Sequence, residues 1–254
     1  VSVAVDDGGR IYVGNADQGN VTVFGSDLVQ QFQLGSGDGE FIMPADIAID
    51  PAGNVYVVDR DNDSIRVFNA DGSFRSTIGA PGSENGQLHR PVSVAIDHAA
   101  SELVVLDRQL TWDPWVRAYI DGARIQYFTP DGQFLRAYEK FGANRDQGEL
   151  KRPQQSAVDS QSRIYVTDSF YNKVMVYDNT GTFLGMIDNP NSPLRTALGV
   201  AFSSTNRLYA ASMGGGQVEV YGIDHYSAME VDPGQLKYTA MEGGNNPGLQ
   251  ALTI

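Results

Sequence analysis

The chain of 254 residues has no cysteine, which excludes disulfide bonds and thiolate chemistry and leaves the redox compartment unreadable. Histidine is nearly as scarce, with three residues, His89, His98 and His225. No apolar run is long enough for a transmembrane helix. Most apolar runs end after about four to six residues in Gly, Asp or Asn, so no run predicts a helix. These absences favour short strands joined by turns.

Basic residues are also few, because 18 Lys and Arg stand against 31 Asp and Glu, giving a formal net charge of -13. A nucleic-acid partner requires a basic face, and an anionic membrane attracts basic segments. We therefore expect neither nucleic-acid binding nor membrane insertion. Val1 lies inside a repeat and no signal segment precedes it, so we expect either a mature secreted protein or an excised domain.

What the sequence does contain is an internal repeat. A phrase of the form Pro-x-x-(Val/Ile)-Ala-(Ile/Val)-Asp occurs in complete or partial copies at residues 2–6, 44–50, 91–97, 153–159 and 197–203. A second phrase, (Val/Ile)-Tyr-Val-x-Asp or a variant, follows each copy at residues 10–15, 54–59, 102–107, 163–168 and 207–212. A period of about forty to fifty residues indicates one supersecondary unit copied along the chain.

Each copy predicts four short strands. In the second copy these are residues 47–50, 55–58, 65–68 and 73–78, separated by turns rich in Gly, Asn and Asp. Such a sheet cannot bury both faces alone, but several stacked around an axis cover one another, which is the solution of a β-propeller. The sequence therefore predicts an all-β propeller over residues 1–222, with blades at about 1–43, 44–90, 91–152, 153–195 and 196–222.

This repeat resembles that of the NHL family of β-propellers over roughly residues 1–222. The resemblance rests on the two recurring phrases, on the hairpins Asp-Gly-x-Phe at residues 71–74 and 131–134, and on inter-blade links such as 82–91. It implies four-stranded antiparallel blades. Propellers of this family often have six blades, and five copies are visible here. The sequence leaves open whether five or six blades close the ring.

The C-terminal residues 223–254 do not continue the repeat. Two strand-like segments within them, LKYTAM and LQALTI, flank a turn-rich stretch. The amino-acid sequence of these segments resembles the first two strands of a BACON-like or immunoglobulin-like domain of secreted bacterial proteins. Two strands cannot form a stable sandwich alone. The segment is therefore the start of a truncated domain, a hairpin packed on the propeller, or an edge that pairs with a neighbouring subunit.

Aspartates recur at fixed positions of the repeat. Asp50, Asp97 and Asp159 end the first strand of their copies, and Asp59, Asp107 and Asp168 end the second. A catalytic site needs one asymmetric set of groups rather than one equivalent in every blade. We therefore expect these carboxylates to accept backbone N–H bonds in tight turns.

Three aspartates of one turn are a weak metal candidate. Asp59, Asp61 and Asp63 have the spacing of a calcium loop, but Ser64 and Ala70 replace the Gly and Glu that an EF-hand requires. A calcium site of another type stays possible here, and the alternative is a solvated acidic turn. We predict no cofactor.

The same resemblance extends to enzymes. NHL-like lyases that cleave peptidyl hydroxyglycine hold zinc with histidines, one of which follows the repeat Pro, and the equivalent positions here are Ala45, Val92, Gln154 and Leu198. None offers an imidazole, so a shared zinc site is not expected. Lactonase-like and streptogramin-lyase-like propellers use acidic, Asn or His groups at the channel mouth. Here Asp46 is the one acidic residue near the start of an inner strand, with Gln154 and Gln155 in register, and this is too little for a catalytic assignment. No catalytic residue is predicted.

The third copy departs from the others. Between its second and third strands, a link of about six residues elsewhere grows to residues 108–123, and these contain both tryptophans of the chain. Trp, Tyr and Arg dominate binding hot spots, and loops on rigid scaffolds carry function. We therefore predict a partner-binding site at Trp112, Trp115, Arg117 and Tyr119. The alternative is that the loop folds back and buries its own aromatic side chains.

These features predict a non-enzymatic interaction or scaffold module of a secreted or cell-surface bacterial protein. Its partner would be a protein or a carbohydrate, bound by rim loops, within a larger extracellular assembly. One alternative is a metal-dependent lyase or lactonase with its site at the channel mouth. Another is a structural subunit of a polymer whose copies pair through the tail strands.

Overall fold

A computed structural model describes residues 2–35, 40–108, 110–113, 117–142, 144–187, 193–223, 237–238 and 252–253, with strands 110–113, 118–121, 237–238 and 252–253 described by their backbone. The elements in these residues are strands and three short 3-10 turns, η1 (Arg60–Asn62), η2 (Arg145–Gln147) and η3 (Met213–Gly215). None of the described helical segments has the length and apolarity needed to cross a membrane. The fold class is all-β, as the repeat predicts.

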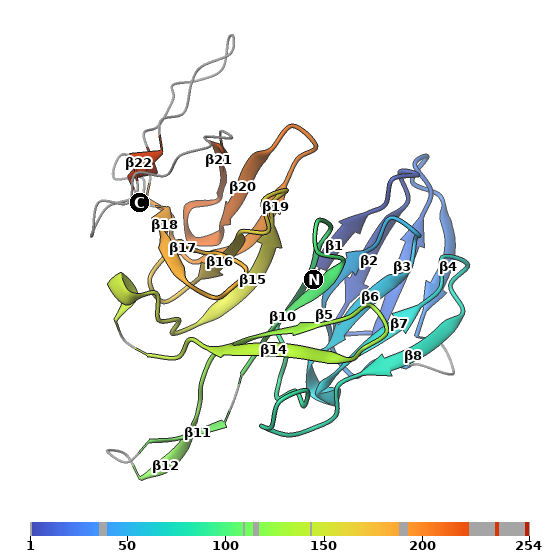
Figure 1. The fold of residues 1–254 in the computed structure, drawn as a ribbon. Helices are drawn as coiled ribbons and strands as arrows, with labels where there is room; N and C mark the ends of the chain where they lie inside the picture. Colours follow the sequence, from blue (N-terminus) through green and yellow to red (C-terminus); the bar gives the residue numbers. More distant parts are fainter. Residues whose placement is uncertain are drawn as a thin grey trace, which may run out of the picture. The chain divides into compact units, whose positions relative to one another are not determined.

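Apart from two separate two-stranded sheets, the described strands form five antiparallel sheets, called blades 1 to 5 in chain order (Figure 1). Blade 1 contains β1 (Ser2–Val5), β2 (Ile11–Asn15), β3 (Asn20–Phe24) and β4 (Gln30–Leu34). Blade 2 contains β5 (Pro44–Ile49), β6 (Val55–Asp59), β7 (Ser64–Phe68) and β8 (Phe74–Ile78). Blade 3 contains β9 (Ser93–Asp97), β10 (Glu102–Asp107), β13 (Arg124–Phe128) and β14 (Phe134–Glu139).

Blade 4 contains β15 (Pro153–Val158), β16 (Ile164–Asp168), β17 (Lys173–Tyr177) and β18 (Phe183–Ile187). Blade 5 contains β19 (Ala197–Phe202), β20 (Arg207–Ser212) and β21 (Gln217–Gly222), so it has three strands among the described residues. In every blade, strands that follow one another in the blade are hydrogen-bonded neighbours. This is the sheet topology of a β-propeller, and the propeller prediction is confirmed.

The chain divides into two compact units, Val1–Glu139 with blades 1 to 3 and Lys140–Ile254 with blades 4 and 5. Within the first unit, β1 lies beside β5 and β5 beside β9, so the first strands of successive blades are neighbours. Within the second unit, β15 lies beside β19 in the same way. The propeller arrangement therefore repeats in each unit.

The hydrophobic core lies between blades rather than inside them. Tyr12 and Val23 of blade 1 pack with Val55 and Val57 of blade 2 in one buried cluster. A second cluster joins blades 2 and 3, and a third joins blades 4 and 5.

The repeated aspartates bind backbone amides, as expected. Asp50 Oδ1 accepts a bond from the Asn54 amide at 2.8 Å, and Asp159 Oδ1 accepts one from Arg163 at 3.0 Å, both across the turn after the first strand. The second set also reaches the preceding link, because Asp168 Oδ2 accepts the amides of Lys151 and Arg152 at 2.7 and 2.9 Å. These carboxylates fasten turns and links.

The predicted immunoglobulin-like segment falls largely outside the described residues. In it, β22 (Lys237–Tyr238) and β23 (Leu252–Thr253) pair antiparallel. The resemblance of this segment to a sandwich domain stays a prediction.

Candidate functional site: an inserted hairpin in blade 3

Blade 3 carries an insertion between its second and third strands. In the other blades, the last paired residues of these strands enclose four residues, 16–19, 60–63, 169–172 and 213–216. In blade 3 the equivalent pair is Asp107 and Arg124, which enclose the sixteen residues 108–123. The strand pairing on either side keeps its register, so the twelve additional residues (16 − 4) leave the blade itself unchanged.

The inserted residues form a hairpin of their own. Strand β11 (Leu110–Asp113) pairs antiparallel with β12 (Ala118–Asp121) in a separate two-stranded sheet that extends away from β10 and β13 (Figure 1). Trp112 and Tyr119 are direct cross-strand partners, so both lie on one face of the ribbon. Two of the four predicted binding residues therefore share a face. Their side chains lie outside what the structure describes.

A third predicted residue, Arg117, lies on the same hairpin. Arg117 directly precedes β12, is exposed, and has a left-handed backbone with φ 52°. Non-glycine residues adopt this conformation uncommonly, mostly in tight turns. Trp115 lies outside the described residues. The structure therefore places Trp112, Arg117 and Tyr119 on one hairpin and leaves the position of Trp115 untested.

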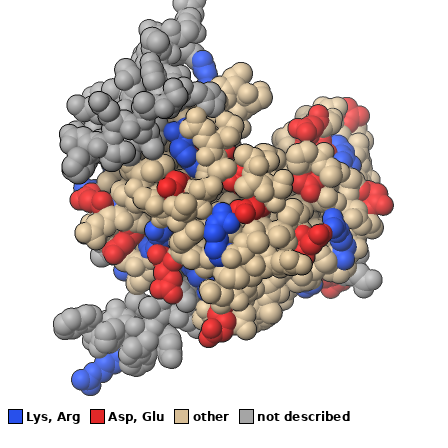
Figure 2. Space-filling model, in the orientation of Figure 1, with Lys and Arg blue, Asp and Glu red and all other residues tan. Residues whose placement is uncertain are grey.

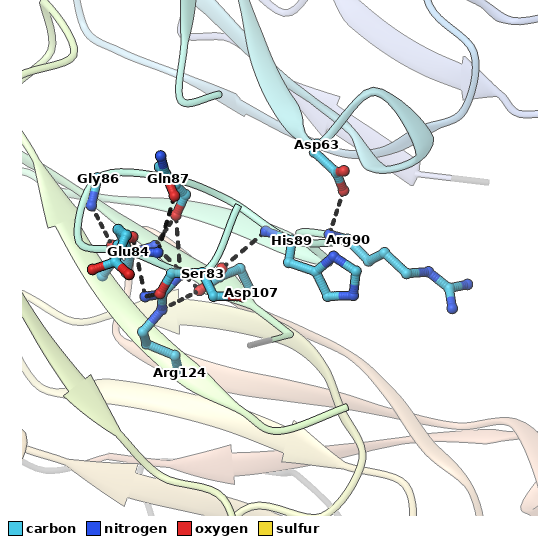
Figure 3. A network of polar contacts seen from close by, with 10 residues as sticks. Asp63, Ser83, Glu84, Gly86, Gln87, His89, Arg90, Asp107 and Arg124 are labelled. Atoms are coloured by element: carbon cyan, nitrogen blue, oxygen red, sulfur yellow. Dashed lines mark hydrogen bonds and ion pairs between the residues drawn. The ribbon is translucent and has the colours of Figure 1, made fainter. Parts of the chain in front are cut away.

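A buried ion pair closes the base of the hairpin. Arg124 donates to Asp107 from Nη2 at 2.8 Å and from Nε at 3.1 Å, and both side chains are buried (Figure 3). Bidentate pairs of this kind are stronger and more directional than single charged bonds. The pair therefore joins the two strand ends that a four-residue turn joins elsewhere.

The same arginine holds the link between blades 2 and 3. Arg124 Nη1 donates to the Ser83 carbonyl at 2.8 Å, and Nη2 donates to the Gln87 carbonyl at 3.0 Å. Gln126 adds bonds to the same link, donating to the Gln87 carbonyl at 2.8 Å and accepting from the Gly86 amide at 3.0 Å. The base of the hairpin is therefore fixed from the strand side and from the link side.

Neither Arg124 nor Gln126 was among the predicted site residues. The available signal was residue type, since the positions equivalent to Arg124 hold Asn20, Ser64, Lys173 and Gln217. Arg124 begins the strand that directly follows the insertion. An arginine at that position could have indicated a contact that replaces the short turn of the other blades. Its carbonyl partners, about forty residues earlier in the chain, are evident only in the folded blade.

A second ion pair fixes the outer strand of blade 3. Arg136 on β14 donates to Glu102 at 2.6 and 2.9 Å and lies over the Tyr127 ring, with 3.8 Å from its guanidinium carbon to the ring centroid. The hydrogen bonds to Glu102 raise the pKa of the Arg136 guanidinium. The Arg136–Glu102 pair therefore links β14 to β10 in the blade that carries the hairpin.

The three aspartates of the calcium-like turn have separate partners. Asp59 is buried and accepts the Met43 amide at 2.9 Å, Asp61 pairs with Arg60 at 3.1 Å, and Asp63 accepts the Arg90 amide at 2.6 Å (Figure 3). Within the described residues, no three His, Cys, Asp or Glu side chains gather as metal ligands would. This geometry gives the turn a structural role.

The polar groups near the start of the first strands bridge blades. Asp46 is buried and accepts bonds from Ser2 Oγ at 3.1 Å, Ser93 Oγ at 2.7 Å and the Val94 amide at 3.1 Å, so it joins blades 1, 2 and 3. Gln155, its equivalent in blade 4, accepts the Val200 amide of blade 5 at 3.0 Å. The shared bond to the next blade shows that this position connects neighbouring blades.

The two histidines that the structure describes, His89 and His98, do not gather with these groups. The His89 backbone amide donates to Asp107 at 3.2 Å, and His98 is exposed at the turn after β9. His225 lies outside the described residues.

Comparison with known proteins agrees with the blade pattern. The family model described as the NHL repeat matches residues 41–68, which span the link to blade 2 and its first three strands. This segment is an NHL repeat. The other blades have the same strand order as this NHL repeat, and the register irregularity between its third and fourth strands recurs in blades 1, 3 and 4.

One curated relative and two solved structures show how far the likeness extends. Protein brain tumor of Drosophila melanogaster is 26% identical over 152 residues, which is 60% of this chain and 13% of that protein. The chain thus spans a small part of that relative's length.

A chain in the crystal structure of a nidogen/laminin complex has a TM-score of 0.66 at 17% identity, covering 87% of this chain and 75% of that one. The streptogramin B lyase structure has a TM-score of 0.56 at 14% identity, covering 94% and 75%. At these identities the solved structures show the fold alone.

Proposed function

We propose that this protein is a non-enzymatic interaction module that binds a protein partner through the inserted hairpin of blade 3. The observation that carries the proposal is the clamp at the hairpin base, where Asp107 and Arg124 join both strands to the link 83–87. Holding a loop in its bound conformation reduces the entropy lost on binding. A twelve-residue insertion that served only as a connection would need no such clamp.

The residues available on the hairpin suit a protein interface. Trp112, Trp115, Arg117 and Tyr119 are of the types that dominate binding hot spots, and the pairing of Trp112 with Tyr119 supports a shared contact face. In Figure 2, basic side chains of the described residues are scattered among acidic ones, which does not favour a nucleic-acid partner. A carbohydrate that stacks on the same aromatic side chains is the second ligand class.

One of the comparisons supports a binding role, and another supports the enzyme alternative. The nidogen/laminin structure is by its title a complex of proteins, and its chain resembles this one in fold. The streptogramin B lyase has the same fold, which supports the alternative of an enzyme with its site at the channel mouth. The bridging bonds of Asp46 and Gln155 favour binding over catalysis, since these groups connect blades. We further propose a location outside the cell, as part of a larger assembly.

The proposal is tested by site-specific photo-crosslinking in extracts and culture supernatant of the source organism. A photoreactive residue in place of Arg117 should capture one discrete partner, while the same residue at exposed Ser160 of blade 4 should not. The double substitution Trp112→Ala and Trp115→Ala should abolish capture from position 117 without changing thermal stability. Equal capture from 117 and 160, or full capture by the double variant, would reject the hairpin as the binding site.

A further inference from the structure

The link between blades 2 and 3 contains the one Asn-Gly pair of the sequence, Asn85 and Gly86. This pair is prone to intramolecular deamidation, because glycine has no side chain to shield its amide nitrogen from the asparagine side chain before it. Asn85 is exposed. The Glu84 carbonyl accepts the Gln87 amide at 3.0 Å, so Asn85 and Gly86 are the two central residues of a tight turn.

The backbone of this turn requires glycine at its second central position. Gly86 has a left-handed backbone with φ 83°, and a Cβ there would lie 3.2 Å from the Cβ of Phe134 on β14. Asn85 does not have a positive φ. This combination is typical of a type II turn, whose first central position accepts most residues. The fold therefore fixes Gly86 and leaves the residue before it free to vary.

Arg124 holds the main chain on both sides of the pair. Before it, Nη1 donates to the carbonyls of Ser83 and Glu84 at 2.8 and 3.3 Å. After it, Nη2 donates to the Gln87 carbonyl at 3.0 Å (Figure 3). The separation between these carbonyls is thus matched to the two ends of one guanidinium group, which is rigid and planar.

Gln126 holds the nitrogen atom that would react. The Gly86 amide donates to Gln126 Oε1 at 3.0 Å. Gln126 is buried, and its Nε2 donates to the Gln87 carbonyl at 2.8 Å and to Asp107 at 3.3 Å. Both ends of this side-chain amide are engaged, so Gln126 stays in place. A glycine amide held as a donor keeps its proton and is not available as a nucleophile.

We propose that Asn85 is a deamidation site and that Gln126 controls its rate. When the link opens, the Gly86 nitrogen attacks Asn85 Cγ. The new N–Cγ bond closes a cyclic imide, the Cγ–Nδ2 bond breaks, and the proton of the Gly86 amide ends on the departing ammonia. Water then opens the imide at Cγ to give aspartate, or at the main-chain carbonyl to give isoaspartate. This chemistry does not depend on the binding role proposed for the hairpin.

The isoaspartate product would loosen the base of the hairpin. Its main chain runs through Cβ and Cγ of residue 85 and is longer by one carbon atom. Arg124 donates to Ser83 before this residue and to Gln87 after it. One guanidinium group cannot reach both carbonyls with their present geometry once the chain between them is longer. The aspartate product adds a charge but keeps the length of the main chain.

The test compares the wild type with three variants at mildly alkaline pH. Gln126→Leu removes the acceptor of the Gly86 amide at similar volume. The matched control, Gln133→Leu, changes an exposed glutamine of the same blade. Asn85→Ser removes the reacting amide. Trypsin cleavage after Arg75 and Arg108 releases residues 76–108, which contain one asparagine. Mass spectrometry of this peptide measures conversion of amide to carboxylate, and an isoaspartyl methyltransferase counts isoaspartate.

Conversion of the wild type should be fast in urea and slow in the folded protein. Gln126→Leu should raise the rate of the folded protein by about tenfold, the most that one hydrogen bond of typical net strength changes an equilibrium. Gln133→Leu should react at the wild-type rate, and Asn85→Ser should give no product. Aged wild type that contains isoaspartate should unfold at lower urea than fresh Asn85→Asp.

Four outcomes would overturn the proposal. Equal rates for folded and urea-unfolded wild type would show that the link gives no protection, and this comparison decides even if Gln126→Leu does not fold. A folded Gln126→Leu protein that reacts at the wild-type rate would remove the role of Gln126. Product from Asn85→Ser would place the reaction elsewhere in the peptide. Aged protein as stable as Asn85→Asp would show that the longer main chain leaves the contacts of Arg124 intact.

Discussion

Asp107 and Arg124 face each other as the last pair of β10 and β13, joined by a buried ion pair of 2.8 Å. In the other blades this pair is closed by a four-residue turn, whose own backbone holds the strands together. Blade 3 has the hairpin insertion at this place. The ion pair, together with the carbonyls of Ser83 and Gln87, therefore supplies the connection that the short turn supplies elsewhere.

Replacing Arg124 should destabilise the protein strongly. Arg124→Met fills similar volume but leaves Asp107 buried without its cation and leaves the Ser83 carbonyl without this donor. Breaking one side of a buried pair costs about 3–5 kcal/mol. The control is Arg75→Met, which removes the exposed pair of Arg75 with Asp131 and should cost about 0–1 kcal/mol. Urea unfolding measures both, and equal losses would contradict the role given to Arg124.

The hairpin itself should be dispensable for folding. Replacing residues 108–123 by the sequence of residues 60–63 restores the four-residue turn and keeps an arginine in the first position. That position donates its amide to the preceding link in both blades, from Arg60 to Met43 and from Arg108 to His89, at 3.0 and 2.9 Å.

We expect the free energy of unfolding of this chimera to lie within about 1 kcal/mol of the wild-type value, because surface changes away from packed features usually have small effects. Urea unfolding is again the measurement. A loss of several kcal/mol would mean that the hairpin packs on the blade and is structural.

The sequence allowed the blades to be predicted but not the clamp. Each strand is bounded by turn residues such as Asp50 and Asn54, which interact locally across the turn, so a local pattern is enough to place them. The hairpin could be located because its aromatic residues interrupt the repeat. Arg124 could not be assigned, because its partners at Ser83 and Gln87 are distant in the chain and come close only when blades 2 and 3 pack.

Gly132 is expected to be a more sensitive position than Gly216, although both have left-handed backbones, with φ of 90° and 62°. A Cβ at Gly132 would lie 2.8 Å from the Ile78 side chain of blade 2, whereas a Cβ at Gly216 would meet nothing within 4 Å. Gly216→Ala should cost about 1–2 kcal/mol from backbone strain alone. Gly132→Ala adds a steric clash in the packed contact between blades, costing about 1–3 kcal/mol more. Equal melting temperatures for the two variants would contradict this contact.

Asp6 should make stability depend on pH in the acid range. Burial alone would raise the pKa of Asp6, but hydrogen bonds from the Arg10 amide at 2.8 Å and the Arg10 Nε at 2.6 Å outweigh it and lower that pKa. A carboxyl whose pKa is lower in the folded state stabilises the protein above its unfolded value of about 3.9, and this contribution is lost as pH falls through the folded value.

Asp6→Asn should therefore be less stable than the wild type at pH 7, by about 1 kcal/mol, the scale of one typical intramolecular hydrogen bond. The difference should shrink as the pH falls below about 4. Unfolding curves of both proteins across this range provide the measurement. A difference that stays constant with pH would show that the charge of Asp6 does not contribute.

A substitution at Asp46 distinguishes the proposed binding module from the alternative of an enzyme with its site at the channel mouth. It accepts the Ser93 hydroxyl and the Val94 amide of blade 3 at 2.7 and 3.1 Å, and the Ser2 hydroxyl of blade 1 at 3.1 Å. Asp46→Ala would leave these buried donors without that acceptor, at about 1–3 kcal/mol for each group left unsatisfied. The variant should therefore unfold several kcal/mol more easily than the wild type. Groups kept for catalysis often carry a stability cost, and their removal is then neutral or stabilising. An Asp46→Ala protein as stable as the wild type would thus favour a catalytic role at the channel mouth, and a large loss of stability favours the blade-joining role.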